Sequence, residues 1–316
     1  MPLPNDEKLI ALSEEILKTF ESVFGPHPGF RPAHAKGVLL TGVFTPSSEA
    51  QELTRAEHIT RPSTPVTVRF SNSTGVPLLP DNDANADPRG MAIRFNLGEH
   101  VHTDIVAHSA NGFPATDGAE FLEFLRAVTQ PDQAKVHEFV GNHPKALAFV
   151  QSITPMPASF AQERYFGLTA MKFTNKDEVS RFGRYIVVPE ATEEHLSAEA
   201  AAAKDQNYLF EEIARRIASG PVRLRLDVQV AEDGDTINDA TVHWPESRKV
   251  VTLGTIELIE VVADTATEQQ KIIFDPIPRL DGIAPSDDPL LELRAAVYLI
   301  SGRRRRSSPP TTVTTV

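Results

Sequence analysis

Residues 87–106 read DPRGMAIRFNLGEHVHTDIV and contain two short strand-like runs, Gly90–Phe95 and Thr103–Val106, on either side of a turn. Polar Arg94 stands beside apolar Phe95, an alternation that is typical of a strand with one buried and one polar face. Turn residues and prolines separate such runs along the chain, as they do in antiparallel sheets. The stretch therefore predicts antiparallel β-structure.

Similar runs lie on both sides of this stretch, and helical spacing interrupts them in the middle of the chain. The other strand-like runs are Val38–Phe44, Val66–Phe70, Phe166–Phe173, Gly183–Val188, Val222–Val230 and Val250–Val262. Apolar residues recur at helical spacing within residues 118–152 and again over Asn207–Ser219. This order predicts an α+β protein, built either as one antiparallel barrel with peripheral helices or as two open sheets.

The N-terminal residues 1–24 have the pattern of an amphipathic helix that docks on the body of the protein. Their apolar residues mostly follow helical spacing, Asn5 or Asp6 can cap the start, and Gly25 can end the helix. The segment lacks the apolar core and cleavage site of a secretory signal, so a cytoplasmic location is expected. No stretch approaches the roughly 20 apolar residues needed to cross a membrane.

At the other end of the chain, a last helix is expected over about residues 287–301. Ser286 or Asp287 can cap this helix, and Gly302 is expected just past its end. Residues 307–316 are rich in Ser, Thr and Pro, which predicts a disordered tail.

The 316 residues include 31 Lys and Arg, 43 Asp and Glu, and no cysteine, which gives a formal net charge of −12. Net acidity argues against nucleic acid as the main partner, because phosphate binding needs a basic surface. The absence of cysteine excludes disulfides, iron–sulfur clusters, cysteine-rich zinc sites and a cysteine nucleophile. A homodimer is the expected assembly, since symmetric pairs are the commonest.

Two residues of the last helix could hold a metal cofactor. Arg294 and Tyr298 are four positions apart and share one helix face. A guanidinium beside a phenol favours the phenolate, and tyrosinate is one of the few haem-iron ligands open to a chain without cysteine. The alternative is an ordinary helix with one surface pair, which is a common arrangement.

A histidine stands directly before the first strand, where the mouth of a barrel would be. His34 has Arg31 and Lys36 nearby, and their positive charges favour the neutral imidazole that a general base requires. A structural role is the alternative for a single histidine of this kind.

Arginines on strands are costly to bury unless they meet an anion. Arg69, Arg89 and Arg94 lie on or beside predicted strands. Asp87 and Asp104 are available as partners, and a bound carboxylate pair is the alternative.

These segments follow one another in a fixed order: R-x-x-H-A-K-G, V-R-F-S, D-P-R-G-x-A-x-R-F, D-I-V and a late R-x-x-x-Y. The ordered set resembles the haem catalase superfamily. It is most similar to the catalase-related peroxidase branch, because the chain has no room for the long arms of full-size catalases. The resemblance covers residues 25–306 and implies one domain with a catalase-like antiparallel eight-stranded β-barrel, peripheral α-helices and haem b.

The resemblance implies roles for four residues. His34 is expected to be the distal base that moves the peroxide proton, and Ser71 is expected to orient it. Tyr298 is expected to be the axial ligand of the haem iron, with Arg294 holding it as tyrosinate.

The resemblance also implies residues that bind the rest of the haem. Arg31 and Arg69 resemble the arginines that bind the propionates, and Phe124 matches a phenylalanine of the distal pocket. Arg305 stands where the family has a basic residue after the ligand tyrosine, although residues 303–306 by themselves have the composition of a solvated basic tail.

The chain departs from the family at two positions. Catalases follow the D-I-V position with an asparagine that orients peroxide; here Asn111 fills that role if the loop is longer, and otherwise Ser109 or His108 stands there. Ala33 replaces a bulkier residue at the approach to the haem. Both departures imply a more open pocket that admits organic peroxides or aromatic donors.

The expected function is a haem-dependent peroxidase that reduces hydrogen peroxide or organic hydroperoxides and oxidises a small organic reductant, with weak catalase activity. The alternatives are a hydroperoxide-rearranging enzyme similar to allene oxide synthases, and a haem-binding protein without turnover. Other histidines predict no site, because His100 and His102 lack a third metal ligand and His58 lies in a polar, surface-like context.

Overall fold

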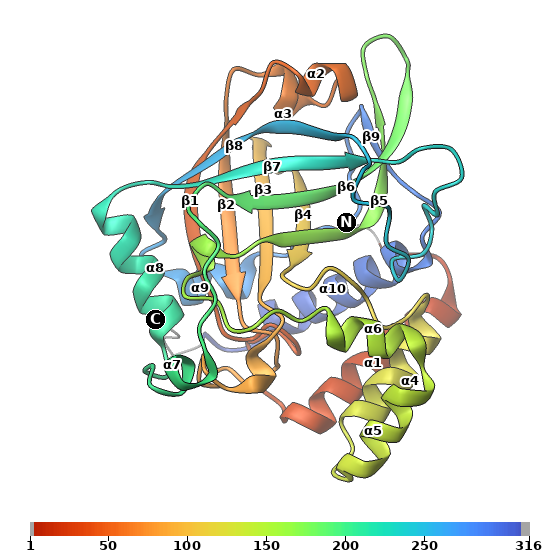
Figure 1. Cartoon of the computed structure of the whole chain (residues 1–316), viewed down its shortest axis with the longest axis vertical. Coiled ribbons are helices and arrows are strands. Elements are labelled where there is room, and N and C mark those ends of the chain that lie inside the picture. The colour runs from red at the N-terminus through yellow and green to blue at the C-terminus, as the bar shows by residue number, and fades with distance from the viewer. Residues whose placement is uncertain (1–2, 311–316) are drawn as a thin grey trace.

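The computed structural model describes residues 3–310, and a closed antiparallel barrel forms its centre (Figure 1). The barrel strands are β1 (Gly37–Pro46), β2 (Thr64–Ser71), β3 (Gly90–Gly98), β4 (Val101–His108), β5 (Tyr165–Thr174), β6 (Ser180–Pro189), β7 (Val222–Val230) and β8 (Val250–Val261). They pair in the order β4-β3-β2-β1-β8-β7-β6-β5, and a bridge between His108 and Phe166 closes the ring. The predicted eight-stranded barrel is confirmed, and the alternative of two open sheets is wrong.

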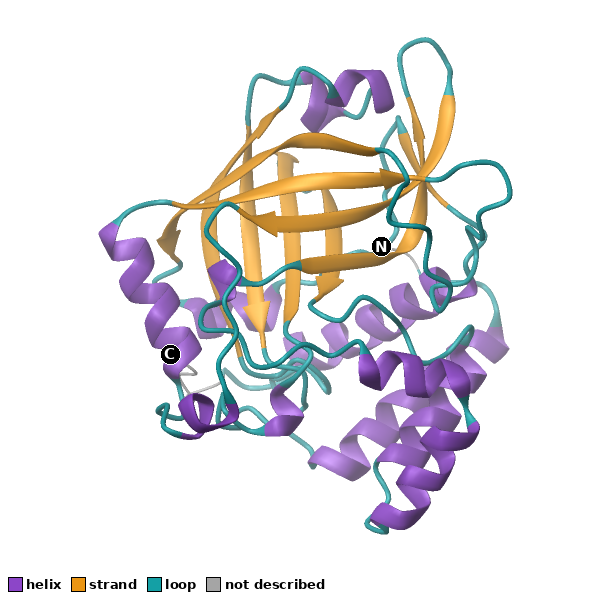
Figure 2. Ribbon diagram, in the orientation of Figure 1, coloured by secondary structure: helices purple, strands orange, loops and turns teal. Residues whose placement is uncertain are grey.

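The helices lie outside the barrel, and most of them gather below it in the view of Figure 2. They are α1 (Glu7–Phe24), α2 (Ala50–Leu53), α3 (Glu57–Thr60), α4 (Gly118–Val128), α5 (Gln133–Asn142), α6 (Pro144–Gln151), α7 (Ala198–Ala202), α8 (Tyr208–Ser219), α9 (Thr265–Lys271) and α10 (Pro289–Ser307). Within residues 3–310, none of them is long and apolar enough to cross a membrane.

Along each strand, successive side chains point alternately into the apolar core of the barrel and to its outer face. Val68 and Phe70 of β2 point into the barrel core, where both are fully buried. Arg69 and Ser71 therefore point to the outer face of the same strand, because successive side chains alternate. Helices α9 and α10 lie on the side of β1–β4, so charged residues of that face are covered by protein (Figure 1).

Helix α1 forms as predicted and docks on α4 and α10. The Asp6 carboxylate accepts hydrogen bonds from the first-turn amides, and Gly25, with a φ of +84°, ends the helix. Ile16 is buried in the interface, and Arg126 of α4 donates to Glu15 over 2.7 Å. The helix thus belongs to the layer that covers the outer face.

The last helix is longer than the sequence suggests. The N-cap of α10 is Asp288, and the helix continues through Gly302 to Ser307. Gly302 is a packing residue rather than a stop, because a Cβ atom there would lie 2.3 Å from Cδ1 of Ile273. Residues 308–310 of the predicted tail are described and begin beside α9, whereas residues 311–316 lie outside the described residues.

The segment between β8 and α10 contains two elements that no strand-like run or helical spacing in the sequence predicts. Helix α9 has no apolar stripe, and its buried residues are Thr265, Gln269 and Gln270. Strand β9 (Ile283–Pro285) is three residues long and pairs with β5. Neither element carries an apolar period that a sequence pattern could reveal.

His58 is buried, which contradicts its predicted surface context. Only 1% of the residue is exposed, and its ring lies between Phe44 and Phe95, with centroid distances of 6.0 Å and 4.5 Å. Helix α3 sets the histidine against the barrel core, and neither ring nitrogen has a hydrogen-bond partner among the described residues. Burial lowers the pKa of His58 to about 3.

Candidate active site

A row of paired residues crosses three strands at one end of the barrel's outer face. Ser71 of β2 pairs with Gly90 of β3, and Gly90 pairs with His108 of β4. Directly paired residues point to the same face, so Ser71 and His108 stand on either side of the side-chain-free Gly90. Because Gly90 has no side chain, a side chain from outside the sheet can lie over it.

His34 fills the space above Gly90. It lies in the loop before β1 with a φ of +58°, and its backbone amide donates to the Ser73 carbonyl over 2.8 Å. Its Nδ1 is 3.2 Å from the Ser71 hydroxyl. A Cβ atom at Gly90 would lie 2.7 Å from this Nδ1 and 2.6 Å from the Ser71 oxygen. Glycine at position 90 is therefore what allows the predicted His34–Ser71 pair to form.

The surroundings of His34 keep its imidazole neutral. Burial, followed by the positive charge of Arg69, lowers the pKa of His34 to about 4, with smaller contributions from Arg31 and Arg294. The imidazole is therefore unprotonated at neutral pH and is available to accept a proton.

Two of the strand arginines are paired with acids, as the sequence allowed. Arg94 makes two hydrogen bonds to the Asp104 carboxylate, over 2.9 Å and 2.7 Å. Arg89 lies 2.8 Å from Asp87. Both pairs are structural, because each guanidinium already has its counter-charge.

Three other arginines gather, and no acid of residues 3–310 forms an ion pair with them. Arg31 donates to the backbone carbonyls of Gln269 and Ile272, both over 3.0 Å. Arg69 donates to the Gln269 side chain over 2.7 Å and to the His34 carbonyl over 2.8 Å. Arg305 donates to the Ile272 carbonyl over 2.8 Å, and its Nε has no partner among the described residues.

The positive charges of these arginines repel one another. Burial and then the neighbouring Arg305 hold the pKa of Arg31 well below its usual value, and the same two causes lower the pKa of Arg69 to about 9. Arg305 is 4% exposed, so the description of residues 303–306 as a solvated tail is wrong for this residue. A cluster of this kind within residues 3–310 needs an anion from outside the chain.

Gln269 is a site residue that the sequence analysis missed. Its side-chain oxygen accepts from Arg69, and its Nε2 donates to the Gly37 carbonyl over 2.8 Å. It fixes the guanidinium of Arg69 against the end of β1. No sequence signal pointed to it, because it lies on the polar helix α9.

Helix α10 brings Tyr298 and Arg294 to the same region. Nε of Arg294 lies 3.2 Å from the Tyr298 oxygen, and both residues are half-buried. Arg294 also reaches the Val106 carbonyl of β4 over 3.4 Å, which ties the helix to the outer face of the barrel. The charge of Arg294 also contributes to the lowered pKa of His34. The Arg294–Tyr298 pair and the His34–Ser71 pair therefore belong to one site.

The sequence offers three residues for the position of the asparagine that orients peroxide in catalases, and the structure places them in different surroundings. Asn111 is exposed. The Ser109 hydroxyl accepts from the Arg89 amide over 3.0 Å, so it is engaged in the loop. Burial, with smaller contributions from His34 and Arg294, lowers the pKa of His108 to about 3. Phe124 of α4 is buried nearby and meets Phe149 of α6 edge-on, with 6.1 Å between ring centroids.

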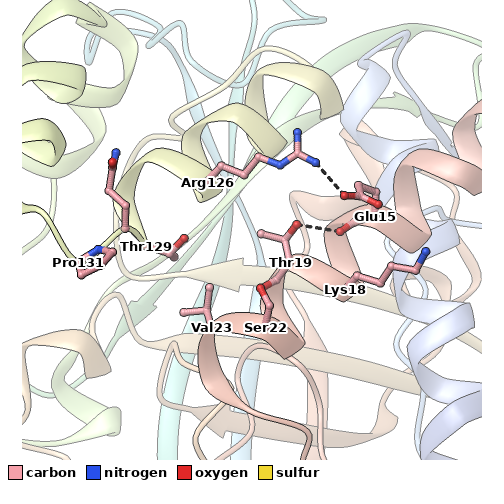
Figure 3. A pocket seen from close by; sticks show the side chains of 9 residues that line it. Glu15, Lys18, Thr19, Ser22, Val23, Arg126, Thr129 and Pro131 are labelled. Carbon is pink, nitrogen blue, oxygen red and sulfur yellow. Dashed lines mark hydrogen bonds and ion pairs between the residues drawn. The ribbon is translucent and has the colours of Figure 1, made fainter.

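A separate surface groove of about 690 Å³ runs between α1 and α4 (Figure 3). It is lined by residues such as Lys18, Thr19 and Arg126, and it includes none of the residues of the candidate site. Its lining mixes charged and small polar side chains without a shared chemistry.

The fold and this site define a closed antiparallel β-barrel whose outer face brings together a neutral histidine, an arginine–tyrosine pair and a cluster of arginines. The chain belongs to the catalase family, whose model, described as "Catalase", matches residues 28–312. A "Catalase-related peroxidase" of Mycolicibacterium paratuberculosis is 35% identical over 295 residues, which cover 91% of this chain and 93% of the relative. A protein of the same description from Synechococcus elongatus is 31% identical, with 91% and 87% covered.

Solved catalases share the fold. A bacterial catalase matches 98% of this chain with a TM-score of 0.78 at 22% identity, and 65% of that catalase is covered. Catalase A from Saccharomyces cerevisiae matches 87% of this chain with a TM-score of 0.78 at 20% identity, and 61% of it is covered. The chain therefore spans about three-fifths of the length of these larger proteins.

Membership of the family implies haem, and the described residues fit this group. The arginine cluster lacks an acid of its own and leaves the buried Nε of Arg305 without a partner. The Tyr298 oxygen lies beside a cation and is one of the donor types that bind haem iron.

Proposed function

We propose that this protein is a haem b-dependent peroxidase that reduces hydrogen peroxide or organic hydroperoxides and oxidises a small organic donor. The observation that carries the proposal is the placement of two pairs around one site. His34 with Ser71 forms one pair, Tyr298 with Arg294 forms the other, and Arg294 acts on both Tyr298 and His34.

Tyr298 and Arg294 would hold the iron from the side of α10. Arg294 places a positive charge beside the phenol oxygen, which favours the phenolate that binds ferric iron. Bound haem supplies the iron that binds a peroxide oxygen and the electrons that break the O–O bond.

Arg31, Arg69 and Arg305 would bind the propionates. Two carboxylates introduced into this cluster would replace mutual repulsion by charge-assisted hydrogen bonds. Gln269 keeps Arg69 in place for this contact. The cluster therefore contributes to cofactor affinity and to its orientation.

His34 would move the proton that O–O cleavage requires. Heterolysis is easiest when one base removes the proton from one peroxide oxygen and delivers it to the oxygen that leaves as water or alcohol. The Ser71 hydroxyl engages Nδ1, so Nε2 is the ring nitrogen left for this transfer. The depressed pKa keeps this nitrogen unprotonated at neutral pH.

The relatives support a peroxidase rather than a catalase as the main activity. The relatives from Mycolicibacterium paratuberculosis and Synechococcus elongatus, which share most of their length with this chain, are described as catalase-related peroxidases. Ala33 is small and half-buried before His34, and Phe149 contacts both His108 and Phe124 edge-on. These features favour a peroxide that carries an apolar group.

An absorption experiment tests the proposal directly. The protein is loaded with haem, and the Soret band and oxygen release are followed after addition of hydrogen peroxide or cumene hydroperoxide with an aromatic donor. A shift of the Soret band with donor oxidation and little oxygen supports a peroxidase. Vigorous oxygen release would make the protein a small catalase, and a failure to take up haem would contradict the proposal.

Tyr298→Phe provides the matching variant. It removes the ligand oxygen and is expected to lose most of the Soret intensity, because phenylalanine cannot bind iron. Tyr185→Phe removes a hydroxyl from the barrel core and serves as the control that should load normally.

A further inference from the structure

Two residues beyond His34, the chain forms an ion pair inside the protein that the roles above do not use. It joins Lys36 to Asp81, in the connection between β2 and β3, over 2.7 Å. Both side chains are fully buried, with 1% and 0% of their surface exposed. We propose that Asp81 is a positioning residue of the peroxide reaction, which holds His34 against Ser71 by hydrogen bonds to the segments that carry them. This inference rests on the proposed function and specifies what orients its base.

One carboxylate oxygen of Asp81 connects the two sides of the His34–Ser71 contact. Its Oδ1 accepts from Nζ of Lys36 over 2.7 Å and from Nδ2 of Asn72 over 2.8 Å. Lys36 follows His34 by two residues, and Asn72 follows Ser71 directly. The Asn72 amide also donates to the Lys36 carbonyl over 3.1 Å. The two segments that form the contact are therefore joined at a second point.

The same aspartate holds the segment that leads into Gly90. Its backbone carbonyl accepts from Arg89 over 2.7 Å, and another guanidinium nitrogen of Arg89 donates to Oδ1 of Asn72 over 2.6 Å. Oδ2 of Asp81 accepts from the backbone amide of Leu209 at the start of α8, over 3.0 Å. Asp81 thus joins the three segments that meet at the row of paired residues and links them to α8.

The ammonium group of Lys36 is held in one orientation. Its three N–H groups all have partners, because besides Asp81 it donates to the Leu79 carbonyl over 3.1 Å and to the Gln206 carbonyl over 3.0 Å. A buried ion pair adds little net stability over apolar side chains of similar size, because both charges lose their hydration. Its hydrogen bonds instead define a single arrangement of the segments that it joins. Proton transfer requires such a fixed arrangement of the base.

The sequence suggests that the charge of Lys36 keeps His34 neutral, but in the structure Asp81 compensates this charge. After burial, the positive charges that lower the pKa of His34 are those of Arg69, Arg31 and Arg294. His108 is a further titratable group that interacts with His34. Substitution of Lys36 or Asp81 leaves all of these groups in the chain, so the position of the His34 ring is the quantity to test.

Two variants that remove opposite charges separate an effect of position from an effect of charge. Lys36→Met removes a positive charge and Asp81→Asn removes a negative one, so charge alone would raise the pKa of His34 in the first and lower it in the second. A ring that loses its position gains water, which moves its pKa toward about 6.5 in both variants.

Stopped-flow spectroscopy of the haem-loaded proteins measures this difference. The pH midpoint of the reaction with hydrogen peroxide should rise in both variants from the wild-type value, set by the His34 pKa of about 4, to about 5 or higher. At pH 8, where His34 is neutral in every case, the rate should still fall about tenfold, because the base is misaligned.

Asp235→Asn is the matched control. Asp235 lies in the loop after β7, its side chain is 8% exposed, and its carboxylate accepts from Arg248 over 2.8 Å. The variant breaks a comparable ion pair and should keep the wild-type pH profile. Urea unfolding of the three variants compares their stabilities, so a general loss of stability is distinguished from a misplaced base.

A second measurement observes the His34 ring without catalysis. The full-length, haem-free chain carries histidine labelled with a nitrogen isotope, and the loss of signals in His34→Gln identifies the ring in the NMR spectrum. We expect one neutral tautomer in wild type and an average of both tautomers in Lys36→Met and Asp81→Asn. Asn72→Ser removes one arm of the arrangement without a change in charge and should give the same average. This variant decides the matter if the charge variants do not fold.

The outcomes separate the inference from the proposed function. If wild type takes up no haem, the peroxidase assignment fails, and the ring signals still decide the role of Asp81. If wild type reacts with peroxide while both charge variants keep its pH midpoint and its single tautomer, the role of Asp81 is wrong and the assignment stands. Midpoints that move in opposite directions would also overturn the inference, because they would show an effect of charge alone.

Discussion

The Nδ1 atom of His34 lies 3.2 Å from the hydroxyl of Ser71, although the two residues are 37 positions apart in the chain. The contact exists because the loop before β1 turns through a positive φ at His34 and because Gly90 has no side chain beneath the pair. The orientation of His34, the proposed base, thus depends on a third residue that contributes no side chain to the site.

Gly90→Ala should disrupt the contact between His34 and Ser71 and leave the barrel folded. The new methyl group would overlap both His34 and Ser71, so one of them must move. We expect the rate of the peroxide reaction to fall about tenfold or more, with haem content close to wild type. Stopped-flow spectroscopy of the loaded protein measures this rate.

Gly98→Ala is the control for that substitution. It lies at the far end of the same strand, where the nearest atom to a new Cβ would be 3.9 Å away. A Gly90→Ala protein that reacts as fast as Gly98→Ala would show that the His34–Ser71 geometry is unimportant.

The pH dependence of the peroxide reaction should report His34. Because its pKa is lowered to about 4, the active neutral form persists as the pH falls from 8 to about 5 and is lost only near pH 4. The rate constant is therefore expected to be flat above pH 5 and to decline below it. A midpoint near 6.5 would mean that burial and Arg69 do not act on this histidine.

Arg305→Met should have opposite effects on the haem-free and the haem-loaded protein. Without haem, the substitution removes a buried cation that repels Arg31 and Arg69, and the Ile272 carbonyl keeps its hydrogen bond from Arg31. The free energy of unfolding is expected to stay equal or to rise. Haem affinity should fall roughly tenfold to a hundredfold, since a hydrogen bond to a charged group is worth about 1.5–3 kcal/mol.

Chemical denaturation and haem transfer to apomyoglobin measure these two quantities. Arg303→Met, at an exposed position of the same helix, should change neither. Equal haem affinity in Arg305→Met and Arg303→Met would remove Arg305 from the binding site.

His58→Phe should stabilise the protein and reduce its sensitivity to acid. Phenylalanine removes two unpartnered ring nitrogens from an aromatic environment, for an expected gain of about 1 kcal/mol at pH 7. The folded pKa of about 3 lies below the unfolded value, so the unfolded chain binds more protons and wild type loses stability as the pH falls from 6.5 toward 3.

The advantage of His58→Phe should therefore grow by about 1.4 kcal/mol per pH unit below 6.5. Urea unfolding at pH 7.0 and 5.5 checks this difference, with His100→Phe as the control at an exposed histidine. A constant difference between the two pH values would contradict the buried neutral state of His58.

The features of this protein that the sequence predicts are those with a periodic apolar pattern or a short sequence motif. All eight barrel strands lie where alternation or apolar runs predict them, and α4, α5 and α6 lie within residues 118–152, where the spacing predicts helix. Asp6 caps α1 as expected. These features depend on neighbours in sequence, and such neighbours are visible in a single chain.

The placement of polar residues was less predictable. Arg305 reads as part of an exposed basic run but is buried, because α10 continues past Gly302 against Ile273. Gln269 belongs to a helix without an apolar stripe, and its contact with Arg69 spans 200 positions. Such residues are buried by partners from other elements, which no local pattern records.

The sequence by itself determined the barrel strands, the order of the motifs and the identities of His34 and Tyr298 as the chemically distinctive residues. Only the tertiary structure decided which polar groups meet. Strand register pairs His108 with Gly90, over which His34 lies, and Asn111 lies exposed in the loop after β4. A shift of one residue would reverse the face of every side chain in a strand, so the site depends on long-range pairing that sequence spacing cannot define.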